Sequence, residues 1–342
     1  MLLALTRAYP EAPVYTLLSD PAFIRQHFPD TTVRTSFLQK LPRFIRSRYR
    51  WLLPLYGAAT EAFDLRDYQV VISSSGAWTK GVVTRVHTTH IAYIHSPFRP
   101  VWDYNETYLR VNRIRGTFRI FTRMLLSYLR LWDFEAAQRP DVLLANSVYT
   151  KARIAKYYRR ESTVLTPPVF TVGLHAPAPT SRREGAFLYV ARPSQTKELS
   201  VVIAAFRKLG LPLRIVGGTR VGTDGNVEFL GQLSDVALQS EYLAARALIH
   251  PVEEDYGLAI AEALAIHLPV VTLGSGGATE LVAPGITGEF FHEVKPESIA
   301  LAVKRLLDHE DQYQFDTLPI LSSEVEFVRQ IHAVVDGYAT RK

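Results

Sequence analysis

Short apolar runs alternate with amphipathic segments along the second half of the chain. FLYVA (187–191) and LRIVG (213–217) have the length and composition of buried strands, and VEFLG (227–231), ALIHP (247–251) and PVVTL (269–273) repeat the pattern. The segments between them, notably near 197–208 and 295–308, have the apolar spacing of helices. Strands that alternate with helices predict a parallel sheet covered on both faces.

The first half shows the same alternation less regularly. Its strand candidates are VYTLL (14–18), QVVISSS (69–75), THIAYIH (89–95), VLLANS (142–147) and STVLTPP (162–168), with helices near 110–137 and 149–158. A stretch rich in Pro, Ser, Thr and Gly at 171–185 is typical of a linker. We therefore expect an α/β domain over 1–170, a second over 186–321, and a C-terminal helix in 322–342 that returns to the first domain.

Composition agrees with two globular domains. The chain has 342 residues, 47% of them hydrophobic, which suggests about two domains. It contains no cysteine, so disulfides, thiolate nucleophiles and cysteine metal sites are excluded. No apolar run reaches the roughly 20 residues that span a bilayer, and the first residues lack the features of a signal peptide. We expect a cytoplasmic protein.

The net charge of +6 is distributed unevenly. Residues 1–165 contain 24 Lys and Arg against 12 Asp and Glu, whereas residues 166–342 contain 15 against 21. Two stretches, 31–60 and 107–132, contain several basic and aromatic residues and no acid. Such stretches favour an anionic membrane surface; plain solvated helix faces remain an equal alternative for either stretch alone. We see no motif of a nucleic-acid-binding module and expect no nucleic acid partner.

The most informative short segment is EEDYGLAIAE (253–262). Glu254 and Glu262 are separated by seven residues, and the second lies in an apolar run. If one helix held both, they would be about 12 Å apart along its axis. Solvated acids near a helix start are one explanation. The other is that both bind hydroxyl groups of one ligand, with Gly257 and the helix start meeting an anion between them.

Two further features follow predicted strands of the second domain. Arg192 and Lys197 come after the first strand and could hold a diphosphate, although paired surface cations are the commoner explanation for such spacing. The turn LGSGGATE (273–280) offers Gly274, Gly276 and Gly277 for close backbone approach, but glycine-rich turns are also common structural features.

These motifs together resemble a known family. EEDYGLAIAEALA, PVV, GGATELV, GITGEFF and ARPSQTK are similar to the signature of family 4 of the retaining glycosyltransferases. In the first half, VRTSFLQKLP, FDLRDYQVVISSSGAWTKGV, HIAYIHSPFRPVWD, ANSVYTKARIAKYY and TPPV resemble a branch that includes mannosyltransferases. The resemblance runs over nearly the whole chain. It implies the GT-B fold, an α/β architecture of two facing Rossmann-like domains with a cleft between them.

The resemblance also assigns roles to residues. It implies that Glu254 and His95 meet the transferred sugar, that Glu262 holds the ribose, and that Arg192 and Lys197 bind the diphosphate. It implies further donor-binding residues, which are Tyr256, Gly257, Leu258, Gly217 and Lys80. Arg99, Asp103, Gly276 and Gly277 are weaker candidates.

The chain departs from the family pattern in two places. The family begins with a strand and a glycine-rich loop, whereas Met1 falls where the first helix should already run, so we expect roughly 20 residues to be missing. A central strand of the first sheet would then be missing. The second departure is His267, which occupies a helix end where the family has Gly; either it accepts an unusual backbone conformation there, or the turn differs from the family's.

The expected activity is retaining transfer of a sugar, with mannose from GDP-mannose as the first guess, to a lipid-linked or other glycan acceptor. The nucleoside-diphosphate sugar is a co-substrate, and neither a cofactor nor a metal ion is expected. A basic first domain would place the protein peripherally on the cytoplasmic face of a membrane. A non-catalytic nucleotide-sugar-binding protein or inactive fragment, and a nucleotide-sugar epimerase, remain alternatives.

Overall fold

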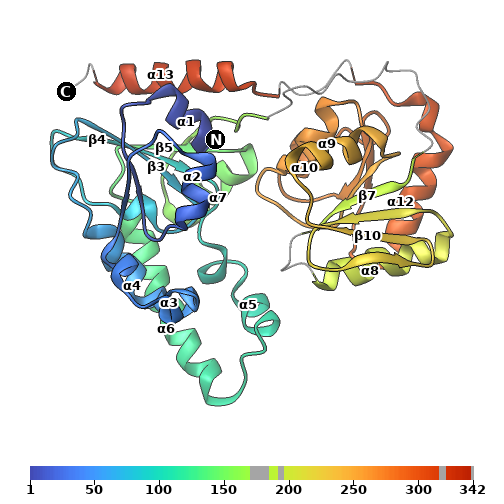
Figure 1. Cartoon of the computed structure of the whole chain (residues 1–342), viewed down its shortest axis with the longest axis horizontal. Helices are drawn as coiled ribbons and strands as arrows, with labels where there is room; N and C mark the ends of the chain where they lie inside the picture. Colours follow the sequence, from blue (N-terminus) through green and yellow to red (C-terminus); the bar gives the residue numbers. More distant parts are fainter. Residues whose placement is uncertain (170–184, 192–195, 316–320, 340–342) are drawn as a thin grey trace. The chain divides into compact units, whose positions relative to one another are not determined.

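The computed structural model of the chain describes residues 1–169, 185–191, 196–315 and 321–339. These residues form two compact units, each considered by itself below. Unit 1 comprises Met1–Pro168 with Glu324–Lys342, and unit 2 comprises Val169–Ser323 (Figure 1). The segment 171–185, predicted as a linker, lies outside the described residues except for its last position.

Unit 2 is built on a mainly parallel sheet, as the apolar runs predicted. Its strands are β7 (Phe187–Val190), β8 (Leu213–Val216), β9 (Val221–Asp224), β10 (Val227–Gly231), β11 (Leu248–His250), β12 (Val270–Leu273) and β13 (Gly288–Phe291). Within the described residues the order is β13-β12-β11-β7-β8-β10-β9, and only β9 runs antiparallel to its neighbour. The sequence interpretation missed β9 and β13.

Helices cover this sheet on both sides. They are α8 (Thr196–Leu209), α9 (Asp235–Ala244), α10 (Leu258–Ala265), α11 (Ala278–Leu281) and α12 (Pro296–Asp308). Helices α8 and α12 lie on one side, and α9 and α10 on the other (Figure 1). Because both faces are covered, strand residues such as Val270 and Val271 are fully buried, and nearly every position of these strands must be apolar.

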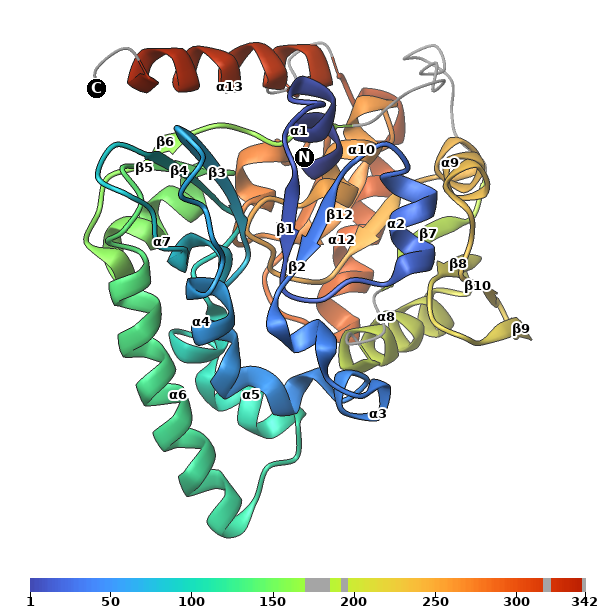
Figure 2. The ribbon, with the colours of Figure 1, turned by 60° about the vertical axis from the view of Figure 1, so that its left-hand side comes forward.

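Unit 1 contains two separate parallel sheets. Within the described residues, β3 (Val70–Ser75), β4 (Thr89–Ile94), β5 (Val142–Ala145) and β6 (Thr163–Val164) form one sheet in that order, and β1 (Val14–Thr16) pairs only with β2 (Val33–Thr35). Figure 2 shows both sheets with α1 (Leu2–Ala8), α2 (Pro21–His27), α3 (Arg43–Arg46), α4 (Leu53–Glu61), α5 (Asn105–Val111), α6 (Gly116–Ala136) and α7 (Val148–Tyr158). The single helix predicted near 110–137 is in fact α6, preceded by the separate α5.

The C-terminal helix α13 (Glu324–Ala339) packs on unit 1. Arg7 at the end of α1 forms an ion pair with Glu324 at 2.7 Å. The ring of Phe327 lies edge-on to buried Tyr93 of β4, with 6.0 Å between ring centroids. Surface charge therefore holds α13 against α1, and apolar contact holds it against β4.

Of the two alternatives for His267, the structure shows the unusual backbone conformation. It follows α10 with φ of 59°, in the left-handed region that glycine normally occupies at a helix end. Its ring stacks on Phe315 at 5.2 Å between centroids. Ring stacking thus offsets part of the strain that a side chain introduces at this position.

None of the described helices is both long and apolar enough to cross a membrane.

Candidate functional site

The candidate donor site lies at the carboxyl ends of the strands of unit 2. Gly217 directly follows β8, Glu254 lies in the loop after β11, and Gly276 lies in the loop after β12. Parallel strands end at the same edge of a sheet, and ligands of open α/β sheets bind there. The topology therefore brings together residues that are far apart in the sequence.

Two loops at this edge pack against each other with no spare room. The Gly277 N–H donates a hydrogen bond to the Glu254 carbonyl at 2.9 Å. A Cβ on Gly276 would lie 2.4 Å from the same carbonyl oxygen, and one on Gly277 would lie 2.6 Å from the Asp255 carbonyl oxygen. These two glycines are therefore required by the chain's own backbone. Our expectation that the glycines serve ligand approach was incomplete, since Gly276 and Gly277 position the loop that carries Glu254.

The helix expected to hold both acids is shorter than predicted. Helix α10 begins at Leu258, and the residue before it, Gly257, has φ of 97°. Glu254 therefore lies in the loop and Glu262 in the helix, so one continuous helix does not hold both acids and the condition for the 12 Å estimate is not met. A side chain at Gly257 would be strained, because that φ is unfavourable for any residue with a Cβ.

Tyr256 and Leu258 flank this turn differently. Tyr256 is buried, and burial raises the pKa of its hydroxyl to about 12. Leu258 is exposed at the first position of α10. Tyr256 therefore belongs to the core beneath the loop, whereas Leu258 lies at the surface, where a ligand could reach it.

Glu262 is the most perturbed acid at this edge. Burial raises the pKa of its carboxyl to about 7, and a hydrogen bond from Tyr242 opposes that shift. The Tyr242 hydroxyl lies 3.3 Å from Oε2 of Glu262. Tyr242 belongs to α9, and nothing in the sequence pointed to it, because its contact depends on how α9 and α10 pack. A half-neutral acid in a partly covered site can accept hydrogen bonds from ligand hydroxyls.

The first strand of the sheet ends beside a close backbone contact. Gly217 has φ of 108°, and a Cβ there would lie 2.1 Å from the carbonyl oxygen of Ala191. Only glycine fits this position, whether or not a ligand binds. Arg192, which follows Ala191 in the chain, lies outside the described residues. Lys197 lies in the first turn of α8, and its side chain is likewise outside the described part of the structure.

In unit 1, His95 lies at the carboxyl edge of the four-stranded sheet. It directly follows β4, and neighbours from the strands on both sides hold it. Ser74 Oγ of β3 lies 2.9 Å from its Nε2. The amide of Asn146, after β5, donates to its carbonyl oxygen at 3.0 Å. Ser74 therefore orients the half-buried imidazole, whereas Asn146 holds the backbone of His95. Ser74 and Asn146 were missed from the sequence.

The loop after His95 holds two of the four weaker candidates. Arg99 begins a short 3-10 helix (Arg99–Val101). Asp103 pairs with Arg153 of α7 at 3.0 Å. Burial, followed by the charge of Asp103, raises the pKa of Tyr157. Asp103 therefore anchors its loop to α7 and is already engaged in structural contacts.

Lys80 is not where the sequence interpretation put it. Its side chain is 1% exposed and forms an ion pair with fully buried Asp133 of α6, with 2.5 Å between Nζ and Oδ1. Nζ also donates to the Ala77 carbonyl. Trp102 donates to the other carboxylate oxygen of Asp133 at 2.8 Å. A buried and paired cation does not meet a phosphate, so the expectation that Lys80 contacts the donor is corrected.

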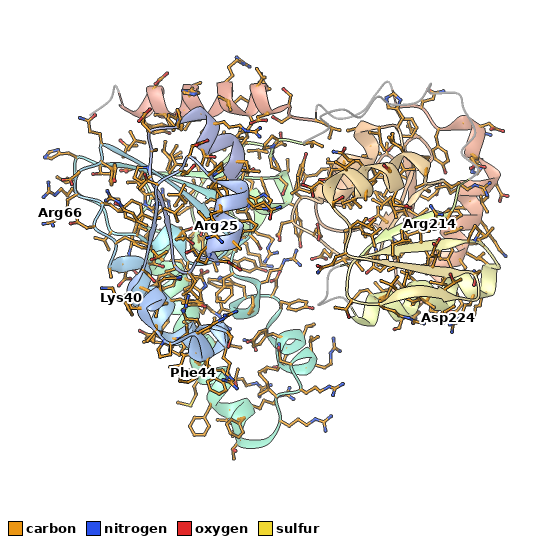
Figure 3. The ribbon with its side chains drawn as sticks, in the orientation of Figure 1. Arg25, Lys40, Phe44, Arg66, Arg214 and Asp224 are labelled. Atoms are coloured by element: carbon orange, nitrogen blue, oxygen red, sulfur yellow. The ribbon has the colours of Figure 1, made fainter. Side chains whose placement is uncertain are left out.

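The basic stretch 31–60 places several of its side chains at the surface of unit 1. Lys40 and Phe44, drawn in Figure 3, are both exposed, and so is Trp51. Among the described residues, no group of three or more His, Asp or Glu side chains could hold a metal ion.

Comparison with known proteins connects unit 2 with sugar transfer. The sequence model of the family described as glycosyl transferases group 1 matches residues 176–315, which lie inside unit 2 and include Glu254 and Glu262. An uncharacterized glycosyltransferase of Methanocaldococcus jannaschii is 29% identical over 140 residues, covering 36% of this chain and 36% of the relative. The chain thus matches about a third of the length of that curated relative.

Two solved structures share the fold over nearly the whole chain. Sucrose-phosphate synthase from Thermosynechococcus elongatus superposes with a TM-score of 0.73 at 18% identity, covering 99% of this chain and 92% of that chain. The Anabaena protein HepE in complex with UDP-glucose superposes with a TM-score of 0.65 at 17% identity, covering 98% and 94%. These likenesses confirm the predicted fold class, GT-B with two Rossmann-like domains.

Proposed function

We propose that this protein is a retaining glycosyltransferase that uses a nucleoside-diphosphate sugar as its donor. The observation that carries the proposal is the edge of unit 2 at which Glu254 and Glu262 flank the start of α10. This edge lies within the region that matches glycosyl transferases group 1. Glu262 would accept hydrogen bonds from the ribose hydroxyls, and Glu254 from the transferred sugar. The N–H groups at the start of α10 would meet the phosphates between them.

The leaving diphosphate must be stabilised as the sugar bond breaks. We assign this role to Arg192, Lys197 and the start of α10, as preorganised positive groups. The acceptor would attack the face from which the diphosphate leaves, and a phosphate oxygen would take the acceptor's proton. His95, held by Ser74, would donate a hydrogen bond to a sugar hydroxyl. We propose that the reaction proceeds without a metal ion.

The choice of donor is tested directly by calorimetry. We place GDP-mannose first because of the family resemblance and UDP-glucose beside it because the Anabaena structure holds that ligand. UDP-N-acetylglucosamine and ADP-glucose complete the panel. Selective binding of one donor supports the proposal. Absence of binding to all four by a folded sample would contradict it, and binding without transfer to any lipid-linked glycan would favour a non-catalytic binder.

The acid Glu262 should make donor affinity depend on pH. Ribose hydroxyls would bind the ionised carboxylate, so donor binding must release a proton wherever free Glu262 is protonated. With a pKa of about 7 in the free protein, affinity should rise as pH increases to about 7 and then level off. Donor binding at pH 6 should be about tenfold weaker than at pH 8. Calorimetry at both pH values, in buffers of different ionisation enthalpy, measures the affinity and the proton release.

The matched variant is Glu262→Gln, which keeps the shape of the side chain without its titration. We expect weaker donor binding at pH 8 and loss of the pH dependence. The pKa of Glu262 in the folded protein lies above its usual 4.5. The free energy of unfolding should therefore fall as pH rises from about 4.5 to 7, and Glu262→Gln should remove this fall. Unchanged affinity in the variant would show that Glu262 does not hold the ribose.

A further inference from the structure

Helix α6 carries an exposed apolar face, here called the apolar stripe. Its residues are each more than 60% exposed, and they are Ile120, Phe121, Met124, Tyr128 and Leu131. Apart from the adjacent pair Ile120 and Phe121, they recur at intervals of three or four residues, so the five share one side of the helix. Leu126 and Leu129 on the other side are buried. The 21-residue helix is therefore apolar on two faces, of which unit 1 covers only one.

Exposed apolar area of this extent calls for an explanation. Single exposed apolar residues are ordinary, but five on one helix face form a contiguous patch of the kind that marks an interaction site. In both views of the ribbon, α6 begins at the end of unit 1 farthest from the four-stranded sheet (Figures 1 and 2). Within unit 1, the stripe therefore lies on a projecting element.

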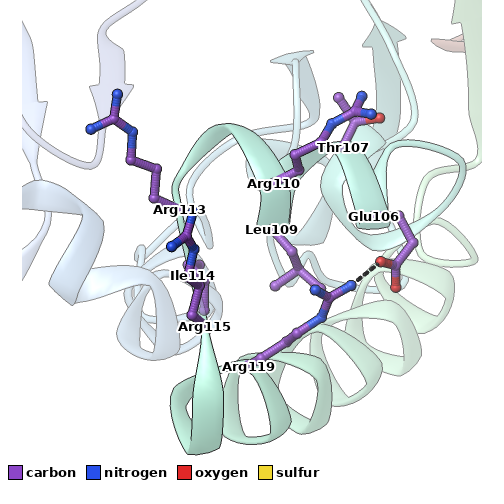
Figure 4. Close-up of a pocket in the computed structure, with 8 residues that line it drawn as sticks. All are labelled: Glu106, Thr107, Leu109, Arg110, Arg113, Ile114, Arg115 and Arg119. Atoms are coloured by element: carbon purple, nitrogen blue, oxygen red, sulfur yellow. Dashed lines mark hydrogen bonds and ion pairs between the residues drawn. The ribbon is translucent and has the colours of Figure 1, made fainter.

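A basic pocket lies next to the stripe, at the turn between α5 and α6. Its volume is about 320 Å³, and its lining includes Arg110, Arg113, Arg115, Arg119 and Glu106 (Figure 4). Glu106 is already bonded to Arg119 at 2.6 Å and to Arg123 at 2.5 Å. The turn itself is tight, with Arg113 at φ of 54°.

Three arginines of this pocket, the arginine cluster Arg110, Arg113 and Arg115, lack partners. All three are exposed, and no described residue forms a hydrogen bond or ion pair with their side chains. Figure 4 shows Arg113 extending away from the Arg119–Glu106 pair. Three uncompensated guanidinium groups at one turn are suited to phosphate oxygens.

We propose that the α5–α6 hairpin, residues 105–136, docks unit 1 on an anionic bilayer. The apolar stripe enters the boundary between headgroups and acyl chains, while the arginine cluster contacts lipid phosphates. An amphipathic helix with a basic flank, lying in the plane of the interface, has this composition. A nucleic acid would not require five exposed aliphatic and aromatic residues, and an apolar protein partner would not require three unpaired cations. The inference does not depend on the transferase activity.

The test is co-sedimentation with vesicles of phosphatidylcholine alone and of phosphatidylcholine with 30% phosphatidylglycerol. We expect binding to the anionic vesicles, weakened by added salt because surface charges are screened. The charge variant Arg110→Gln/Arg113→Gln/Arg115→Gln should bind about a hundredfold more weakly, at roughly fivefold for each basic residue near an anionic surface. The stripe variant Ile120→Gln/Phe121→Gln/Met124→Gln should lose at least tenfold.

Matched controls remove the same groups elsewhere. Arg25→Gln/Arg85→Gln/Arg159→Gln removes three exposed charges of unit 1 outside the hairpin; Arg25 is drawn in Figure 3. Val221→Gln/Val236→Gln/Leu301→Gln removes three exposed apolar residues of unit 2. Both should bind nearly as wild type.

Four results would overturn the proposal. Three of them are no binding to anionic vesicles, equal losses of binding in the control variants, and wild-type binding by the stripe variant. The fourth is that the wild-type protein is a dimer without vesicles, whereas the stripe variant is a monomer. The last would assign the stripe to a second copy of the chain.

A separate observation concerns the edges of the two sheets in unit 1. Strand β3 bonds to β4 through alternate residues, as the bond from Thr89 N–H to the Gln69 carbonyl shows. The backbone N–H and C=O groups of Val70 and Ile72 therefore point away from β4. In the other sheet, those of Tyr15 on β1 point away from β2. No described residue forms a hydrogen bond with these groups of Val70, Ile72 or Tyr15. Strands β1 and β3, which belong to different sheets, thus each present an open edge.

Both open edges line the same groove. It has a volume of about 780 Å³, and its walls include Tyr15, Val70 and Ile72 together with Leu2 and Leu5 of α1. We infer that the groove accepts one extended apolar peptide strand, parallel to β3, that bonds to both edges and joins the two sheets. A row of backbone donors and acceptors on each wall, with apolar side chains between, favours a strand over a small ligand.

The probe is a designed extension fused to Met1, because α1 begins beside the groove. It consists of six alternating Val and Ile residues, matching the six residues of β3, followed by a Gly-Ser-Gly turn. We expect hydrogen exchange of the Tyr15, Val70 and Ile72 amides to slow at least tenfold. The control extension replaces every second apolar residue with Ser and should protect less. Unchanged exchange at all three amides with the apolar extension would refute the inference.

Discussion

Replacing Lys80 with methionine should lower the free energy of unfolding of unit 1 by about 3–5 kcal/mol. The substitution removes one partner of a buried ion pair and leaves Asp133, whose side chain is fully buried, as an uncompensated charge. The hydrogen bond from Trp102 remains, but one neutral donor does not replace the cation. The large expected effect arises mainly from the charge left behind.

Tryptophan fluorescence during urea unfolding measures this effect selectively. The chain has four tryptophans, at positions 51, 78, 102 and 132, and all belong to unit 1. The matched variant is Lys80→Met/Asp133→Asn, which removes both charges while the Asn oxygen can still accept from Trp102. It should recover at least about 1 kcal/mol relative to Lys80→Met. A loss below about 1 kcal/mol in Lys80→Met, or no recovery in the double variant, would mean that the pair is less buried than described.

Replacing Gly277 with alanine should lower the rate of sugar transfer about a hundredfold. The new Cβ would lie 2.6 Å from backbone atoms of both Asp255 and Tyr256, and backbone cannot move aside as a flexible side chain can. The loop carrying Glu254 must then shift, and a displacement of about 1 Å in a catalytic constellation can cost this much rate. Initial rates with the donor identified by calorimetry give the measurement.

The control for this variant is Gly337→Ala in α13. A Cβ there meets nothing within 4 Å, so the same chemical change is made without a clash. We expect wild-type transfer and a slightly more stable helix in the control. Wild-type transfer by Gly277→Ala would show that the loop tolerates the displacement or that Glu254 does not act in the reaction.

The strands of unit 2 were predictable because burial on both faces forces continuous apolar runs. VEFLG coincides with β10, and FLYVA and LRIVG each overrun their strands by one residue. Strand β9 was missed because its sequence, VGTD, is almost entirely exposed and has no apolar run. Strand β13, GEFF, contains too short an apolar segment to stand out. An edge position or a short length removes the signal on which such a prediction depends.

The candidate site was predictable in part. The sequence singled out Glu254, Glu262 and His95 through their motifs. The structure places Glu254 and His95 after the carboxyl ends of strands, and Glu262 inside α10. The partners of these residues, Tyr242 and Ser74, were invisible, because helix packing and strand pairing create those contacts. One helix does not hold both acids, because Gly257 takes a left-handed conformation and α10 begins only after it.

The sequence by itself determined the alternation of strands and helices, the two-domain α/β organisation and the conformational demand at His267. These depend on local pattern, which burial and backbone sterics translate directly into structure. The tertiary structure alone decided that Lys80 is a buried partner of Asp133, that Gly276 and Gly277 make room for their own neighbouring loop, and that one face of α6 is left uncovered. Each of these depends on which segments, distant in the sequence, come into contact in the fold. A local pattern of residues does not specify those contacts.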